Sequence, residues 1–323
     1  MQLINNTKIK GAKISPDSII ECESLKIGKN SVIEENVSII AKNISIGDSV
    51  LIQKNTTIKS LKGVMEKVVI GDQVLIGYSN QIFSPEFTIG DYSQIHNSGL
   101  HSGYKPLIIG HNCWIGQSSI LNCTEKLEIG NNVRIGTQSQ LWTHVASGEL
   151  LEGCTLIGFK PLVIKDNVWI VGGAVISPGL ILEKNSIIMT GAVLTKSTTA
   201  FHTYAGVPAK DVTEKINFWK PMEIIEKKDM MKKFVKDFII ENPEYQNSIF
   251  FEDNKINLES NDYTGKVIIQ ESVKGWKVAK QNDISLFDLK TKRYIKNKTI
   301  VEIAWIKWCL GYRARFIPYN FID

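Results

Sequence analysis

The sequence predicts a mainly β protein: a left-handed parallel β-helix, a triangular solenoid of hexapeptide repeats, followed by a small C-terminal α+β domain. Three observations predict it: a recurring Ile-Gly-x tripeptide, a near-constant spacing between its copies, and a change of pattern after residue 196. The 323 residues suffice for one large domain and a smaller one. We expect the β-helix over residues 1–210 and the α+β domain over residues 211–323.

The tripeptide sets the period of the solenoid. Its glycines are Gly28, Gly47, Gly71, Gly90, Gly110 and Gly130. Most steps between them are 19 or 20 residues, close to the length of three hexapeptides, which make one triangular coil. In such a coil the aliphatic residue points inward and stacks on its equivalent about 4.8 Å away, while Gly, Asn and Asp suit the corners. A sandwich of short strands would not keep this register.

Two intervals are longer than one coil. They are the 24 residues from Gly47 to Gly71 and the 35 residues from Gly130 to Lys165. Both predict loops expelled from the solenoid.

The C-terminal part follows a different pattern. Apolar residues at helical spacing predict an amphipathic helix over residues 222–241, ended by Asn242 and Pro243. Residues 266–269 have the pattern of a strand, and the apolar residues 299–310 fit either a helix or a buried strand. These segments predict the α+β domain.

Composition excludes several classes of protein. The five cysteines form no CxxC pair, so zinc-ribbon and redox motifs are absent. The net charge of +5 comes with no basic-aromatic motif, so we expect no nucleic-acid partner. No run reaches the roughly 18 apolar residues of a membrane span, and the N-terminus has no apolar core of a signal peptide. We therefore expect a cytoplasmic protein without an integral membrane segment.

Four linked motifs carry a family resemblance. They are KPLVIKDNVWI at residues 160–170, GGAVISPG at 172–179, GAVLTK at 191–196 and AGVPAK at 205–210. In order and spacing they resemble the hexapeptide-repeat acyltransferases, particularly the branch of maltose, galactoside and xenobiotic acetyltransferases. The resemblance implies acetyl-CoA as co-substrate, no metal, a sugar or polysaccharide acceptor, and a homotrimer with its active sites between neighbouring chains.

The resemblance also implies a catalytic base. In the family a histidine in a Thr-His context precedes the Lys-Pro-aliphatic segment, and here Thr143 and His144 match. A neutral imidazole that takes the proton of an acceptor hydroxyl accelerates such a transfer about 10²–10⁴-fold. Residues 146–159 replace the usual short segment. Glu149 or Glu152 there would either orient the imidazole, as carboxylates often do, or be solvated loop charges.

Six positions match coenzyme contacts of the family: Trp169, Gly172, Thr190, Thr195, Lys196 and Lys210. The lysines suit the 3′-phosphate, since phosphates are bound by cations. Three residues are candidates for acceptor contacts: His101, Trp142 and Glu149. Among these, His101 precedes a second Lys-Pro-Leu segment two coils before His144. His96 and His101 also have the HxxxxH spacing of carbonic anhydrases on this solenoid, but no third histidine precedes them.

Several functions are compatible with these motifs. O-acetylation of a sugar, in a bacterial surface polysaccharide or glycoconjugate, is the leading hypothesis. The alternative is N-acylation of a nucleotide-linked amino sugar. A non-catalytic scaffold and a carbonic anhydrase agree less well with the motifs around His144.

Overall fold

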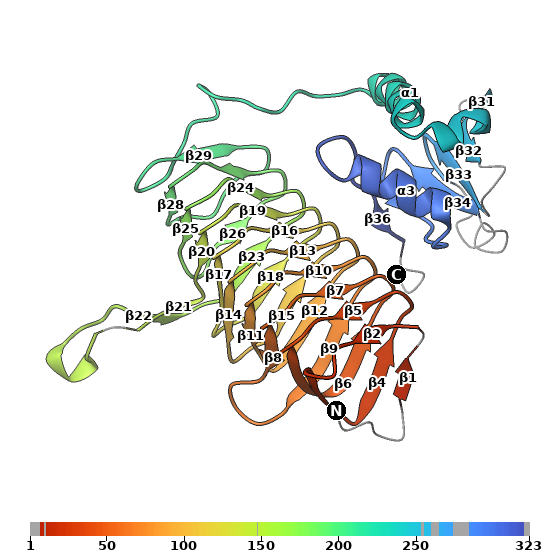
Figure 1. The fold of residues 1–323 in the computed structure, drawn as a ribbon. Coiled ribbons are helices and arrows are strands. Elements are labelled where there is room, and N and C mark those ends of the chain that lie inside the picture. The colour runs from red at the N-terminus through yellow and green to blue at the C-terminus, as the bar shows by residue number, and fades with distance from the viewer. Residues whose placement is uncertain are drawn as a thin grey trace. The chain divides into compact units, whose positions relative to one another are not determined.

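The computed structural model describes residues 7–9, 11–146, 148–252, 255–259, 265–273 and 284–319. The chain divides into two compact units, residues 1–219 and 220–323. In the first unit, short parallel strands stack into a solenoid, with one strand of each coil on each of three faces (Figure 1). The predicted parallel β-helix of hexapeptide coils, with a small α+β domain after it, is confirmed.

Each face is a ladder of parallel strands, and β6 runs from the third face into the first. The first face contains β1 (Thr7–Ile9), β4 (Ser24–Ile27), β6 (Ser38–Ile46), β9 (Met65–Ile70), β12 (Glu86–Ile89), β15 (Leu107–Ile109), β18 (Leu127–Ile129), β23 (Leu162–Ile164) and β26 (Ile181–Leu182). The second contains β2 (Lys13–Ile14), β5 (Val32–Ile33), β7 (Leu51–Ile52), β10 (Leu75–Ile76), β13 (Gln94–Ile95), β16 (Trp114–Ile115), β19 (Arg134–Ile135), β24 (Trp169–Ile170), β27 (Ile187–Ile188), β29 (Thr203–Ala205) and the antiparallel β30 (Lys210–Asp211). The third contains β3 (Ile19–Glu21), β8 (Thr57–Lys59), β11 (Gln81–Phe83), β14 (Leu100–Gly103), β17 (Ile120–Cys123), β20 (Gln140–Leu141), β25 (Val175–Ile176) and β28 (Val193–Leu194).

The core is a set of straight columns of aliphatic side chains. Strand register aligns the isoleucines of the Ile-Gly tripeptides from coil to coil, as in Ile70 opposite Ile89 and Ile89 opposite Ile109. Each of these isoleucines is at most 2% exposed. Because side chains alternate along a strand, every inward position joins such a column while its neighbours face outward. The predicted stacking is confirmed.

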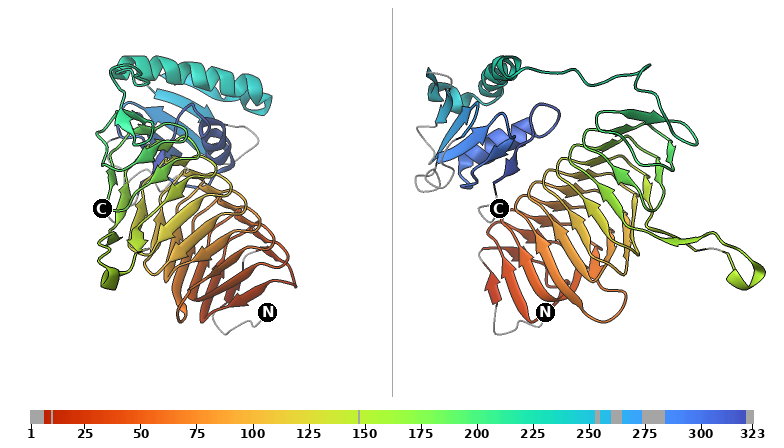
Figure 2. Two further views of the ribbon diagram at one scale, coloured as in Figure 1. Left: turned by 90° about the vertical axis from the view of Figure 1, so that its left-hand side faces the viewer. Right: turned by 180° about the vertical axis from the view of Figure 1, so that it is seen from behind.

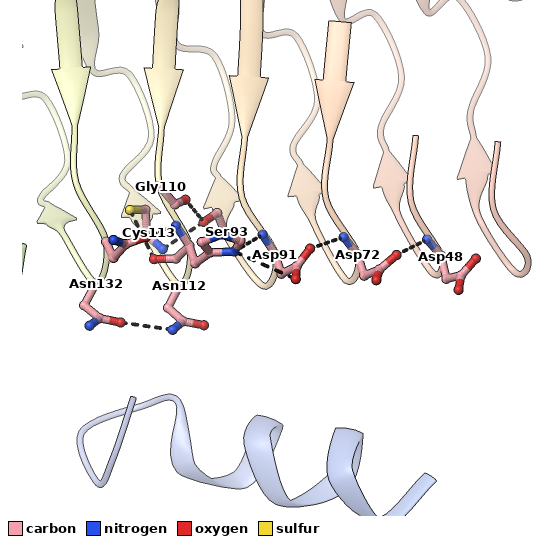
Figure 3. A network of polar contacts seen from close by, with 10 residues as sticks. Asp48, Asp72, Asp91, Ser93, Gly110, Asn112, Cys113 and Asn132 are labelled. Carbon is pink, nitrogen blue, oxygen red and sulfur yellow. Dashed lines mark hydrogen bonds and ion pairs between the residues drawn. The ribbon is translucent and has the colours of Figure 1, made fainter. Parts of the chain in front are cut away.

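The corner after the first face is held by a ladder of side-chain oxygens (Figure 3). The carboxylate of Asp72 accepts the backbone N–H of Asp48 (2.6 Å), and that of Asp91 accepts the N–H of Asp72 (2.8 Å). His111 Nδ1 and Asn131 Oδ1 continue the ladder, each at 2.9 Å. The third residue of the tripeptide therefore binds the backbone of the preceding coil, which explains why it is so often Asp or Asn.

The glycine of the tripeptide is required by the close approach of the coils. A Cβ on Gly90 would lie 2.7 Å from the carbonyl carbon of Gly110, one coil later. Real Cβ atoms do not approach backbone so closely, so a side chain there would force the coils apart.

The two long intervals are loops, as predicted. Residues 60–64 separate β8 from β9, and a hairpin leaves the solenoid after β20. Both loops emerge where the third face turns into the first, which we call the catalytic edge because His144, the base predicted from the sequence, also lies there.

The second unit is a mixed sheet with two helices in the part of the chain that the structure describes. It comprises α1 (Ile224–Glu241), η2 (Pro243–Ser248), β31 (Ile249–Glu252), β32 (Lys255–Glu259), β33 (Lys266–Gln270), β34 (Ile284–Asp288), β35 (Arg293–Tyr294), α3 (Ile300–Cys309) and β36 (Ile317–Pro318). The helix predicted over residues 222–241 is confirmed as α1, and the strand at 266–269 as β33. Neither helix of this unit is long and apolar enough to span a membrane.

Residues 299–310, which fitted either helix or strand, form α3. The Thr299 hydroxyl accepts the backbone N–H of Glu302 (3.3 Å), a standard N-cap contact. The buried Trp305 ring meets Phe238 of α1 edge to face, with centroids 5.4 Å apart. The helix is apolar because it packs between α1 and the sheet.

A histidine lies among the aliphatic columns of the solenoid core. His101 is fully buried in the column between Ile82 and Leu121, and neither ring nitrogen has a hydrogen-bond partner among the described residues. A Cβ on Gly99 would lie 2.5 Å from His101 Nε2, so the glycine makes room for the ring. Burial lowers the pKa of His101 from 6.5 to about 4.

This burial predicts an acid-sensitive core. An unfolded histidine titrates near 6.5, so stability is complete above that pH and falls as the pH drops toward 4. Relative to wild type, His101→Leu should gain about 2 kcal/mol of unfolding free energy between pH 7.5 and pH 5, measured by urea denaturation followed by circular dichroism. Parallel pH profiles for the two proteins would contradict this assignment.

Candidate active site

A hairpin arm leaves the solenoid at the catalytic edge (Figures 1 and 2). His144 is the first residue of its first strand and lies at the base of the arm. The arm consists of β21 (His144–Ala146) and β22 (Ile157–Phe159), paired antiparallel with His144 opposite Phe159. The short helix η1 (Leu150–Glu152) lies toward its tip. The arm is the expelled loop that the long interval after Gly130 predicted.

Asn122 holds the imidazole in one tautomer. His144 Nδ1 lies 2.9 Å from Asn122 Oδ1. Backbone N–H groups of Thr124 and Thr143 point at the same atom, each at 3.3 Å. Because a backbone N–H can only donate, the atom they meet is the amide oxygen and not the amide nitrogen. His144 Nδ1 therefore carries the proton, and Nε2 carries the free lone pair.

Thr143 fixes Asn122 in turn. Its hydroxyl lies 2.7 Å from Asn122 Oδ1 and accepts the backbone N–H of Glu125 at 3.0 Å. Thr143 is fully buried and Asn122 nearly so. A buried amide with several fixed partners cannot rotate freely, so the imidazole orientation is set by the solenoid and not by the arm.

Two aromatic rings flank the imidazole. Phe159 stacks on it at a centroid distance of 6.1 Å with an interplanar angle of 14°, and Trp142 meets it edge to face at 6.0 Å. The imidazole is half-buried between these apolar surfaces. Trp142, predicted to contact an acceptor, thus lies beside the predicted base.

The orienting group is a residue that sequence reasoning missed. Glu149 and Glu152 lie toward the tip of the arm, both exposed and beyond the three ladder pairs that separate them from its base. The oxygen at the imidazole belongs instead to Asn122, one coil earlier. The coil period is the sequence feature that could have indicated Asn122. Leu121 pairs with Leu141, and this register places Asn122 beside Trp142 on the neighbouring coil.

The predicted role of His101 in acceptor binding is wrong. Its side chain is fully buried in the core, because residue 101 occupies an inward position of β14. His96, its partner in the HxxxxH spacing, instead packs against Trp114, with ring centroids 4.7 Å apart and ring planes tilted by 50°.

Five of the six predicted coenzyme positions lie at two edges of the solenoid, and the sixth lies on its second face. Thr195 and Lys196 follow β28 at the catalytic edge, since register aligns Leu141 with Ile176 and Leu194. Trp169 faces outward from β24 and is 48% exposed. The remaining three flank the edge between the second and third faces: Gly172, Thr190 and Lys210. Within one chain, therefore, not all six predicted coenzyme positions lie at the same edge as His144.

Sequence and structure comparisons place this solenoid among known proteins. Residues 106–137 match the family model described as the hexapeptide repeat of succinyl-transferase. Galactoside O-acetyltransferase of Escherichia coli is 29% identical over 129 residues, covering 39% of this chain and 63% of that protein. The chain thus contains hexapeptide repeats and is similar in sequence to acetyltransferases, which confirms the resemblance inferred from its motifs. It spans less than two thirds of the length of the curated relatives that it matches.

Two of the solved structures to which the chain is similar are acetyltransferases. One is a hexapeptide-repeat acetyltransferase of Vibrio cholerae in complex with acetyl-CoA, 20% identical, covering 47% of this chain and 71% of that one, with a TM-score of 0.33. The other is a maltose O-acetyltransferase of Clostridium difficile, 21% identical, covering 45% and 67%, with a TM-score of 0.32.

The contact with Asn122 predicts the tautomer of His144. In ¹⁵N NMR spectra of the neutral ring, Nδ1 should give the signal of a protonated nitrogen and Nε2 that of an unprotonated one. Asn122→Leu removes the acceptor, so both tautomers should then be populated. A protonated Nε2 in the wild-type protein would refute the assignment.

Proposed function

We propose that this protein transfers an acetyl group from acetyl-CoA to a sugar hydroxyl, with His144 as the general base. The observation that carries the proposal is the contact of His144 Nδ1 with Asn122 Oδ1, because it leaves Nε2 as the proton acceptor. The second support is the match of the flanking motifs to acetyltransferases. Acetyl-CoA supplies an activated thioester, and no metal takes part in this scheme.

The chemistry assigned to His144 is a single proton relay. Nε2 removes the proton of the acceptor hydroxyl as its oxygen forms the new bond to the thioester carbonyl carbon. The positive imidazolium is stabilised by its N–H contact with Asn122 Oδ1. When the carbon–sulfur bond breaks, Nε2 returns the proton to the leaving sulfur. The base is thereby restored after each transfer.

We infer that the acceptor belongs to a surface polysaccharide or glycoconjugate and is acetylated in the cytoplasm. All five cysteines are free thiols, the state that a reducing compartment maintains. An amino group on a nucleotide-linked sugar is the alternative acceptor, and it requires the same base.

We further propose a homotrimer with three shared sites. The coenzyme positions on two edges of one chain support it, because a neighbouring copy can set its Trp169 side against the catalytic edge of this one. The exposed Trp169 and the exposed leucines of the arm, Leu150 and Leu151, offer apolar surface for such contacts.

The first test concerns the base. His144→Ala should lower kcat by at least about 10²-fold with little change in acetyl-CoA affinity, because a general base acts in the transition state. The assay is CoA release across sugars, polysaccharide fragments and nucleotide-linked amino sugars. Turnover close to wild type in the variant would overturn the role of His144, and the preferred acceptor class decides between O- and N-transfer.

The second test concerns the shared site. Chains with His144→Ala, mixed with chains carrying Trp169→Ala and Lys210→Glu, should regain part of the activity that each lacks alone. The reason is that some mixed interfaces combine an intact His144 from one chain with intact Trp169 and Lys210 from its neighbour. An active monomer in dilute solution, measured by light scattering, would contradict the trimer and its shared sites.

A further inference from the structure

The catalytic edge carries a second group of side chains in the coils before His144, all of them exposed except the half-buried Phe83. They are three lysines and two aromatic residues: Lys59, Lys62, Phe83, Tyr104 and Lys105, which together we call the corner track. All five lie at or near the turn from the third face to the first, as does His144. The residues that hold His144 do not include any of them.

Hydrogen bonds connect the track to the site coil by coil. Tyr104 N–H donates to Cys123 O at 3.0 Å, and Asn122 beside Cys123 holds His144. Further back, Phe83 is in register with Lys59 and with Ser102. Lys59 therefore lies four coil steps before Trp142, a span of about 19 Å. This is longer than a single sugar ring.

The lysines lie against the aromatic rings. Lys59 Nζ is 5.9 Å from the centre of the Phe83 ring, and Lys62 Nζ is 5.1 Å from that of Tyr104. Lys62 belongs to the expelled loop at residues 60–64, where the Ser60 hydroxyl donates to its carbonyl at 2.7 Å. Tyr104 is 52% exposed. The loop thus brings a cation over an aromatic ring that still faces solvent.

The carboxylates that the structure describes do not neutralise the charges of the track. None of its three lysines forms an ion pair with a described carboxylate. By contrast, three lysines on or beside the adjoining first face are paired: Lys42 with Glu66 (2.6 Å), Lys67 with Glu86 (3.0 Å) and Lys126 with Glu128 (2.7 Å). Glu125 follows one coil after Lys105 without an ion pair between them. The track is therefore a cationic strip beside a face on which several lysines are paired with carboxylates.

We propose that the corner track binds an acidic saccharide chain, so that the acceptor is an anionic oligo- or polysaccharide lying along the catalytic edge toward His144. This inference rests on the proposed acetyl transfer. Lysine ammonium groups pair with carboxylates or phosphates of the chain, and the aromatic rings pack against the apolar faces of sugar rings. Several weak contacts along one chain add in affinity.

Binding tests the track without catalysis. An octamer of galacturonic acid should bind the wild-type protein, and a neutral maltooctaose much more weakly. Reversing the charges in Lys59→Glu/Lys62→Glu/Lys105→Glu should weaken octamer binding at least about tenfold, measured by titration calorimetry at low salt. The matched control is Lys13→Glu/Lys26→Glu/Lys29→Glu, which alters three exposed, unpaired lysines away from this edge and should bind like wild type.

The track would be overturned by absence of octamer binding by the wild type, by equal binding of the neutral octamer, or by equal loss in the control triple variant. Tighter binding of an oligothymidylate of the same charge would assign the strip to nucleic acid and also overturn the proposal.

Activity separates this proposal from the acetyl transfer itself. CoA release with a neutral monosaccharide should be the same in the Lys59/Lys62/Lys105 variant and the wild type. With acidic acceptors, KM should be higher in the variant than in the wild type, and the ratio of the two KM values should increase with the length of the acceptor. If acetyl transfer occurs without any preference for long acidic acceptors, the track fails and the proposed function stands. If the octamer binds at the track but no acceptor is acetylated, the proposed function fails instead.

Discussion

The close stacking of successive coils is the constraint on which the rest of this structure depends. Strands in each face are about 4.8 Å apart, and at the corners the backbone comes close enough that a Cβ on Gly90 would meet Gly110 at 2.7 Å. Such contact is tolerated because the oxygens of Asp72 and Asp91 satisfy the N–H groups that the corners expose. Glycine for space and a short polar acceptor for the backbone are therefore required at the same turn.

The stacking of coils brings residues that are one period apart in the sequence into contact at the candidate site. Residues about 20 positions apart become neighbours, so Asn122 reaches His144 although 22 positions separate them. The imidazole then takes its orientation from the rigid solenoid, while the arm contributes Phe159 as an apolar wall. Insertions leave the solenoid at corners, because a corner can be lengthened without disturbing the ladders on either side. The arm and the loop at residues 60–64 both emerge at one edge, and this gathers the proposed base and the cationic strip there.

Several features were predictable because they are periodic or local. The coils, the two expelled loops and α1 follow from the spacing of Ile-Gly, from the intervals between its copies and from helical apolar spacing. Residues 299–310 were ambiguous because α3 is apolar nearly all round, and only its packing against Phe238 decided for helix. His101 was misread because a histidine beside Lys-Pro-Leu has the pattern of a site residue, whereas its inward position in β14 places it in the core.

The sequence by itself determined the repeat, the position of the arm and the identity of the candidate base, because each follows from the spacing of residues or from linked motifs. Only the tertiary structure decided which atom orients His144. That atom is the amide oxygen of Asn122, and the carboxylates of Glu149 and Glu152 lie elsewhere, toward the tip of the arm. The tertiary structure also placed Trp169 on the second face and Lys196 at the catalytic edge, on different sides of one chain. The physical reason is the same in each case. Contacts across coils depend on register and on the direction of each side chain, and one sequence shows the period without showing which side chains meet.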